Sequence, residues 1–337
     1  MSTVDRFVKV FNLPPALIPY VDLIVTSQEM ELVVGLGAQA LTVAEVAEMM
    51  RVSEEEAGAL LTELFRRDIV DRKAADGGAA YTVGNFYTNM DFWTGFEVGS
   101  WQRLPPQVRG AVSEWQMEEW LKLWEREMDI IRRDPDTYVR MKNRDVLLLE
   151  EALDLVGAAE AICLLPCACK TTTMPGSPII EGSMRLGARA RQTLERGQGR
   201  SLTVDEAKAH LLALDRMGLI HTGPRAWRAH DPQQEWISHG NCHPAYSFPM
   251  RAGMRLGMTK AYPRVHHVAR VDWDACTHCG VCIGRCLFSA FYHDGSVESV
   301  HGQKVRQVKF DPEPCWGCGL CASACPEGVI VMEQIAG

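Results

Sequence analysis

Two runs of closely spaced cysteines near the C-terminus constrain this chain more than any other feature. Each run has two, two and three residues between neighbouring cysteines: Cys276, Cys279, Cys282 and Cys286 in the first, and Cys315, Cys318, Cys321 and Cys325 in the second. A cubane of iron and sulfide takes four thiolates, three from a short loop that wraps the cluster and one from elsewhere. The runs therefore predict two 4Fe-4S clusters. Two zinc sites are disfavoured, because four-cysteine zinc sites typically use separated two-cysteine knuckles.

With Pro326 after the second run, this region resembles the two-cluster bacterial-type ferredoxins, and we assign it to residues 266–337. The resemblance implies that Cys276, Cys279, Cys282 and Cys325 bind one cluster, and that Cys315, Cys318, Cys321 and Cys286 bind the other. Leu287 departs from that pattern, because a proline commonly follows the first run. The long interval between the runs predicts an extra hairpin that contains residues 292–295 and 305–310.

The chain has 337 residues, of which 47% are hydrophobic and 23% charged. These values are typical of a folded protein of two or three domains. No apolar run is long enough for a membrane span, and Asp5, Arg6 and Lys9 lie where a secretory signal would be apolar. We expect a cytoplasmic protein, in which cysteines serve metal or redox chemistry more often than disulfides.

We predict that residues 1–90 form a domain that resembles a winged helix-turn-helix. Capping boxes at Thr42 to Glu45 and Ser53 to Glu56 mark two helix starts, and a hairpin turns at residues 76–78. DNA binding is disfavoured because the second of these helices opens with three glutamates, although the set Arg66, Arg67, Arg72 and Lys73 argues the other way. Residues 31–40 imitate a dinucleotide fingerprint, but the sequence that follows predicts helices, so we favour a loop there.

Residues 91–144 form a predicted helical connector that holds five of the nine tryptophans. Five residues of this connector recur at helical spacing and would form one stripe along a helix: Met117, Trp120, Trp124, Met128 and Ile131. A stripe of this kind is usually core, and the alternative is an anchoring surface for a larger partner.

We predict that residues 145–265 form a middle α+β domain. Its expected helices cover residues 145–160, 183–196 and 203–217, and its expected short strands cover residues 219–222 and 235–238. Residues 185–270 hold fourteen Lys and Arg against six Asp and Glu, in a chain of formal net charge −8. This basic segment suits an anionic cofactor or an acidic partner. The alternative is that its arginines only lie on solvated helix faces.

Four further cysteines fall in the middle domain: Cys163, Cys167, Cys169 and Cys242. Pro166 to Lys170 and Asn241 to His243 resemble motifs of iron-sulfur proteins that join a winged helix, a Cys-x-Cys middle domain and a two-cluster ferredoxin domain. Such relatives carry more cysteines there, which implies that a third site is reduced or altered. The four thiols could form that site, His243 could join Cys167, Cys169 and Cys242, or the cysteines could be only structural. We expect Cys167 and Cys169 to lie in one extended segment, on the same face as Cys163.

These features predict a multidomain α+β protein that carries single electrons as an iron-sulfur subunit of a larger oxidoreductase. We expect two 4Fe-4S clusters, a flavoprotein or metalloenzyme subunit as redox partner, no nucleic acid and no transmembrane segment. A different hypothesis is a redox-sensing regulator that uses the winged helix. A third is a reductase with its active site at an unusual middle cluster, although no catalytic motif supports it.

Overall fold

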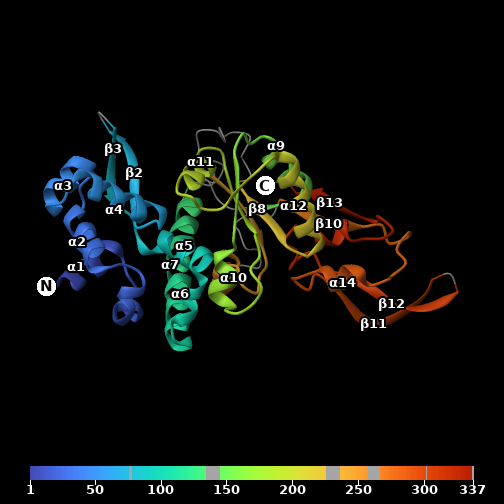
Figure 1. The fold of residues 1–337 in the computed structure, drawn as a ribbon. Helices are drawn as coiled ribbons and strands as arrows, with labels where there is room; N and C mark the ends of the chain where they lie inside the picture. The colour runs from blue at the N-terminus through green and yellow to red at the C-terminus, as the bar shows by residue number, and fades with distance from the viewer. Residues whose placement is uncertain (76–77, 134–144, 225–235, 257–265, 301, 336–337) are drawn as a thin grey trace. The chain divides into compact units, whose positions relative to one another are not determined.

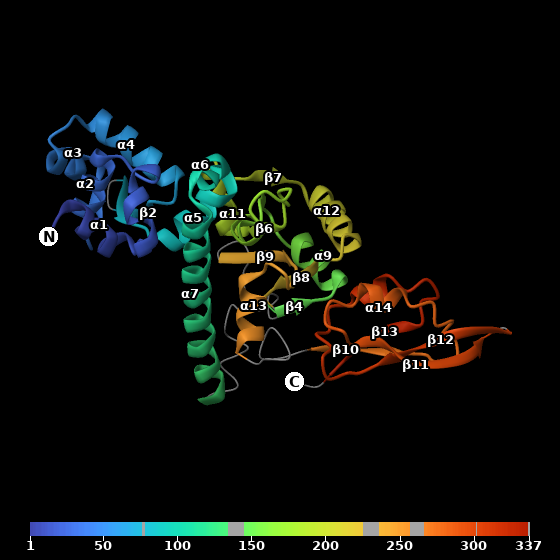
Figure 2. The same cartoon turned by 90° about the horizontal axis from the view of Figure 1, so that it is seen from below.

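The computed structural model describes residues 1–75, 78–133, 145–224, 236–256, 266–300 and 302–335 (Figures 1 and 2). It contains both helices and sheets, arranged in two compact units between which the chain passes several times. The first unit comprises residues 1–118, 166–180 and 193–199, and the second comprises 119–165, 181–192 and 200–337. The domain border expected after residue 90 falls inside helix α5 (Phe86–Phe96), and those expected after 144 and 265 adjoin segments outside the described residues.

The first unit is mainly helical and encloses one hydrophobic core that extends from Phe7 to Val112. Its small antiparallel sheet has the order β1-β3-β2. The elements are α1 (Thr3–Phe11), η1 (Pro15–Leu23), α2 (Ser27–Leu36), β1 (Leu41–Thr42), α3 (Val43–Met50), α4 (Glu54–Arg66), β2 (Val70–Ala75), β3 (Gly78–Val83), α5, α6 (Val98–Arg103), the start of α7 (Pro106–Arg133) and α10 (Ala168–Thr173).

Local sequence signals fix several of these elements. The capping boxes at the starts of α3 and α4 form as predicted: the Thr42 amide donates to Glu45 at 2.7 Å, and the Ser53 amide donates to Glu56 at 2.9 Å. β2 and β3 pair as the expected hairpin, whose turn at residues 76–77 lies outside the described residues. Residues 31–36 belong to α2, so the segment that imitates a dinucleotide fingerprint begins in a helix and not after a strand.

The tryptophans of the expected connector are mostly core residues. Trp93, Trp101 and Trp124 are at most 2% exposed, and Trp101 packs edge-on against Trp93 at 5.5 Å between ring centroids. Met117 of the helical stripe is also fully buried. Two of the five stripe residues, Met117 and Trp124, are therefore core residues, whereas Trp120 and Met128 are only partly buried.

A short segment distant in sequence completes the first unit. Arg196 lies against the base of the β2–β3 hairpin, where its Nε is 3.3 Å from Asp68 and its Nη1 donates to the Val70 carbonyl at 3.1 Å. The guanidinium also covers the Phe65 ring at 4.0 Å. Only 3% of the Arg196 side chain is exposed, so this cation of the basic segment forms a buried ion pair within the protein.

We predict that Arg196→Ala lowers the free energy of unfolding by about 3–5 kcal/mol, because it leaves the buried carboxylate of Asp68 without its cation. Arg103→Ala removes an exposed arginine of the same unit and should change stability by less than about 0.5 kcal/mol. Chemical denaturation of both variants measures the difference. Equal effects would contradict the assigned role of Arg196.

The second unit contains a six-stranded antiparallel sheet of order β4-β8-β9-β6-β5-β7. Two helices, α9 and α12, pack together over a core with one face of this sheet. The elements are β4 (Asp145–Leu147), α9 (Leu149–Gly157), β5 (Ile162–Leu165), β6 (Ser183–Leu186), α11 (Gly187–Glu195), β7 (Arg200–Leu202), α12 (Val204–Arg216), β8 (Ile220–Gly223), β9 (Trp236–Cys242) and α13 (Phe248–Arg255).

Two predicted helices of this region begin as strands. Residues 145–147 and 183–186 are the strands β4 and β6, and the helices α9 and α11 start only after them. The side chains of β6 alternate between partly buried and fully buried, which is the two-residue period of a strand. The predicted helix over 203–217 is correct and begins with a capping box at Thr203.

The C-terminal part of the second unit consists of two antiparallel strand pairs and two short helices. β10 (His267–Val271) pairs with β13 (Ile330–Gln334), and β11 (Phe291–Val300) pairs with β12 (Gln303–Phe310) as the expected extra hairpin. Helix α14 (Val281–Arg285) lies inside the first cysteine run, and α15 (Leu320–Ser323) lies inside the second.

Candidate metal centres

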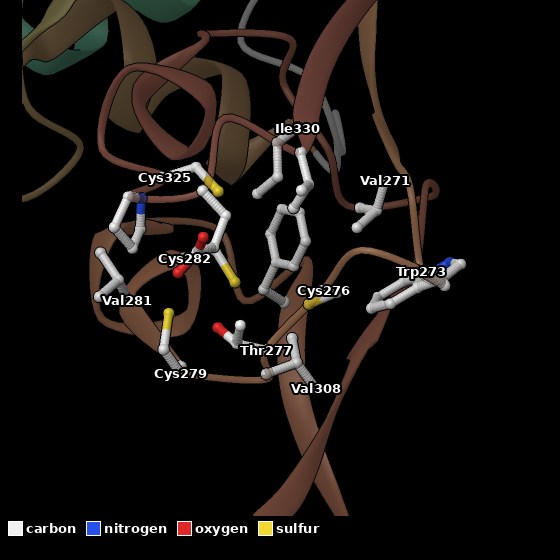
Figure 3. A pocket seen from close by; sticks show the side chains of 15 residues that line it. Val271, Trp273, Cys276, Thr277, Cys279, Val281, Cys282, Val308, Cys325 and Ile330 are labelled. Carbon is white, nitrogen blue, oxygen red and sulfur yellow. The ribbon is translucent and has the colours of Figure 1, made fainter. Parts of the chain in front are cut away.

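One cavity of the C-terminal part is lined by four cysteines drawn from both runs (Figure 3). Cys276, Cys279 and Cys282 come from the first run, and Cys325 comes from the end of the second. The cavity encloses about 370 Å³ of empty space. Apolar side chains such as Val271, Phe291 and Ile330 complete its wall. We call it the first cysteine cavity.

A second cavity has the reciprocal composition. Cys315, Cys318 and Cys321 of the second run line it together with Cys286, the last cysteine of the first run. It encloses about 300 Å³ of empty space. We call it the second cysteine cavity. Four thiols around an apolar space fit an iron-sulfur cubane in each case, because such clusters are held by cysteine thiolates.

The two cavities are built on similar loops. Gly280 and Gly319 each precede a short helix and have left-handed backbone angles, with φ of 76° and 77°. Glycine adopts this conformation without the steric cost that a side chain would add. At Gly319 a Cβ atom would also come within 3.0 Å of Leu148, so this loop packs closely against the start of α9. Gly284 has open space around it and shows no such requirement.

A histidine that we had not singled out fastens the loop of the first cavity. The Val308 amide donates to Nδ1 of His278 at 3.1 Å, and Nε2 lies 3.3 Å from the Glu298 carboxylate. The indole of Trp273 stacks on the imidazole at 6.0 Å between centroids. These contacts tie the cysteine loop to the β11–β12 hairpin. In the sequence, only the position of His278 between two cysteines points to this role.

The second cavity has an aromatic wall, and an arginine next to Cys286 links this region to helix α12. Phe288 stacks on Trp316 at 4.0 Å between centroids, and both residues line the cavity. Arg285, in the turn between Cys282 and Cys286, donates to the carbonyls of Asp215 and Arg216 at the end of α12. Sequence reasoning missed Arg285 because its partners lie about 70 residues earlier in the chain.

Burial raises the pKa of four of the eight cavity thiols, which favours their protonated form. It raises the pKa of Cys282 to about 11 and that of Cys318 to about 12, and it raises the pKa values of Cys276 and Cys321 as well. Thiolates held close together would also repel one another, which acts in the same direction. Metal binding must therefore displace protons from these sites.

The middle cysteines are arranged differently. Cys163 is fully buried on β5 opposite Arg185, which lies opposite Ser238 on β9, whereas Cys242 is four residues farther along β9. The path from Cys163 to Cys242 crosses two strand spacings, from β5 to β9, and then runs four residues along β9. These steps place the two cysteines about 16 Å apart. Cys242 Sγ lies 3.6 Å from Thr222 Oγ1. The register therefore does not bring Cys163 and Cys242 together.

The expected extended segment around Cys167 is wrong. β5 ends at Leu165, Cys167 is the N-cap of α10, and Cys169 lies within that helix. Residues two apart in a helix do not share a face, so the alternation expected for a strand is lost. Cys167 and Cys169 belong to the first unit, whereas Cys242 and His243 belong to the second.

His243 follows β9, and its Nδ1 accepts a hydrogen bond from the Ala245 amide at 3.1 Å. Its ring stacks on Tyr246 at 5.6 Å between centroids. Burial lowers the pKa of His243, which favours the neutral imidazole over the charged one. Among the described residues, no three His, Cys, Asp or Glu side chains are grouped to hold a single metal ion.

Comparison with known proteins identifies the C-terminal part. Residues 269–332 match the family model of the 4Fe-4S dicluster domain. This part of the chain is a ferredoxin-like dicluster domain. The match supports iron-sulfur clusters as the cofactor, and the two cysteine cavities lie within the dicluster domain.

Curated relatives share only a short stretch with this chain. Indolepyruvate oxidoreductase subunit IorA of Pyrococcus abyssi is 33% identical over 72 residues, which are 21% of this chain and 10% of the relative. The subunit of the same name from Thermococcus kodakarensis is 37% identical over 62 residues, 18% of this chain and 8% of the relative. The matched stretch thus spans about a tenth of these relatives. No solved structure matches the chain.

Within the ranges that the structure describes, no helix is both long and apolar enough to cross a lipid bilayer.

We predict that Cys325→Ser and Cys321→Ser damage different clusters, although these residues are four positions apart. Cys325→Ser should alter the same EPR signal as Cys276→Ser, and Cys321→Ser should alter the other signal, because the cavities exchange their fourth ligands. Cys163→Ala, outside both cavities, serves as the control. If Cys325→Ser and Cys321→Ser change one common signal, each run holds its own cluster.

We also predict a pH dependence of cluster loading. The raised thiol pKa values favour the protonated cysteines, so loading of the metal-free protein should weaken by about tenfold per pH unit for each proton displaced as the pH falls below 9. The metal-free fold should lose stability in the opposite direction, as the pH rises from 9 towards 12 and these thiols ionise. Iron titrations at pH 7 and pH 9, and denaturation at pH 8 and pH 11, measure the two effects. Constant affinity from pH 7 to pH 9 would contradict the displacement of protons, and an unfolding free energy that does not fall between pH 8 and pH 11 would contradict the raised pKa values.

Proposed function

We propose that this chain is an iron-sulfur subunit of an oxidoreductase that passes single electrons through two 4Fe-4S clusters. The observation that carries the proposal is the pair of reciprocal cysteine cavities, each with four thiols and an apolar wall. We assign Cys276, Cys279, Cys282 and Cys325 to one cluster and Cys286, Cys315, Cys318 and Cys321 to the other. Bound there, the clusters supply one-electron chemistry at potentials set by their charge and hydrogen bonding.

The backbone offers a short connection between the two cavities. Cys282 lines the first and Cys286 lines the second, and the Cys286 amide donates to the Cys282 carbonyl at 3.0 Å. One turn of chain thus joins a ligand of each proposed cluster. This arrangement suits transfer of electrons between them within a single small domain.

The charges of the N-terminal part argue against DNA binding. We propose that residues 1–90 are a winged-helix module that binds protein and not DNA. The exposed first turn of α4 carries Glu54, Glu55 and Glu56, which would repel phosphates. Three of the four basic residues nearby are already paired: Arg66 with Glu63, Arg67 with Glu29 and Arg72 with Glu195.

The names of the curated relatives support an oxidoreductase as the larger assembly that this chain would serve. Their name describes subunits of an oxidoreductase, and we propose that this chain also serves a multisubunit oxidoreductase, with a flavoprotein or metalloenzyme subunit as partner. Their named substrate is not carried over, because the shared stretch is about a tenth of their length. A cytoplasmic location stays our expectation.

A third cluster in the middle domain also stays a prediction, with Cys167, Cys169, Cys242 and His243 as its candidate ligands. Cys163 is the weakest of the predicted set because the sheet register separates it from Cys242. If the site is absent, these cysteines are structural thiols.

Anaerobic purification with iron and sulfide quantification tests the proposed function. We expect about eight irons per chain for two cubanes, and about twelve if the third site is filled. The reduced protein should show EPR signals of 4Fe-4S clusters and should co-purify with a redox subunit from its native host. Fewer than about four irons, or a DNA gel shift that depends on cluster oxidation, would overturn the proposal in favour of the structural or regulatory alternative.

A further inference from the structure

The two cysteine cavities differ in their access to solvent. In the first, Cys279 is exposed, and Trp273 and Val281 at its edge are 43% and 42% exposed. In the second, Cys315 and Cys321 are each 8% exposed, and Trp316 is 3% exposed. An external electron carrier can therefore approach the first cavity more closely than the second.

A small set of exposed residues surrounds this opening, and we call it the port. Its members both line the first cavity and are solvent-exposed: Trp273, Cys279, Val281, Pro326 and Glu327. Figure 3 shows Trp273 at one edge of the cavity, with Cys279 and Val281 on the other side. The Trp273 ring is held in place by its stack on His278. A fixed aromatic ring loses little conformational freedom on binding, which is a property of interface anchors.

The port has an acidic border. Asp272 and Asp274 flank Trp273 and are both exposed, and Glu327 is exposed on the cavity lining. Among the described residues that line this cavity, there is no Lys or Arg. A negative field around the opening attracts positively charged surfaces and repels negatively charged ones.

We propose that the port receives a one-electron redox protein whose own centre is surrounded by Lys and Arg. The inference rests on the proposed function, since it assigns the partner surface of the cluster in the first cavity. One electron crosses between that cluster and the partner's centre, so that one is oxidised as the other is reduced and no covalent bond changes. The second, more enclosed cavity then exchanges electrons within the protein.

The test compares two triple variants with the same change in net charge. Asp272→Lys/Asp274→Lys/Glu327→Lys reverses the port, and Glu118→Lys/Glu125→Lys/Glu150→Lys reverses three exposed acids outside both the port and residues 1–90. Iron and sulfide are first measured in each full-length protein. Fewer than about four irons in the unmodified protein would count against the proposed function itself.

The first readout is binding without electron transfer. Isothermal titration calorimetry of the oxidised protein uses cytochrome c as a basic redox-protein probe, at low and at high salt. We expect the port variant to lose at least about tenfold in affinity and most of the salt dependence, while the control variant changes less than about threefold. Trp273→Ala should also weaken binding, and Trp273→Phe should restore most of it.

The second readout is the rate at which the reduced protein is oxidised by small probes in an anaerobic stopped-flow instrument. Port reversal should slow oxidation by hexaammineruthenium(III), a cation, and accelerate oxidation by ferricyanide, an anion. If the fully loaded port variant binds cytochrome c and reacts with both probes as the control variant does, the port assignment is wrong and the two-cluster function stands.

Discussion

The exchange of one cysteine between two loops is the constraint on which the dicluster domain depends. Cys286 belongs to the first run but lines the second cavity, and Cys325 belongs to the second run but lines the first cavity. Neither cavity can be completed by a local segment, so the two runs must fold together. The β10–β13 pair closes the domain by joining the strand before the first run to the strand after the second. Because a metal site of this kind rarely exists in the unfolded chain, ligation and folding are linked.

The dicluster domain is fastened to the middle sheet by contacts within the second unit. Arg285 donates to the last carbonyls of α12, where a cation also complements the helix dipole. His266 lies 3.4 Å from Asp145, and both side chains are 3% exposed. Gly319 approaches Leu148 at the start of α9. A ligand loop of each cavity is thus adjacent to a contact with the middle domain, which suits a fixed electron path better than a freely moving carrier domain.

The sequence predicted those parts whose signals are local. Cysteine spacing indicated the dicluster domain, and capping boxes at Thr42 and Ser53 marked helix starts that the structure contains. The strands β4 and β6 were missed because three or four residues before a helix carry too little periodicity to separate the two. Arg196 was counted only among the basic residues of segment 185–270, and no role was predicted for Arg285, since the partners of both are distant in sequence and emerge from tertiary contacts. The extended segment expected at Cys167 failed because a short helix, α10, begins there.

The exchange of fourth ligands is the central claim, and it can be observed directly. Crystals of the anaerobically purified protein should give anomalous difference density at the iron absorption edge. The account predicts one iron cluster bonded to Cys276, Cys279, Cys282 and Cys325, and a second bonded to Cys286, Cys315, Cys318 and Cys321. Iron bonded to Cys286 together with Cys276, or to Cys325 together with Cys315, would contradict it.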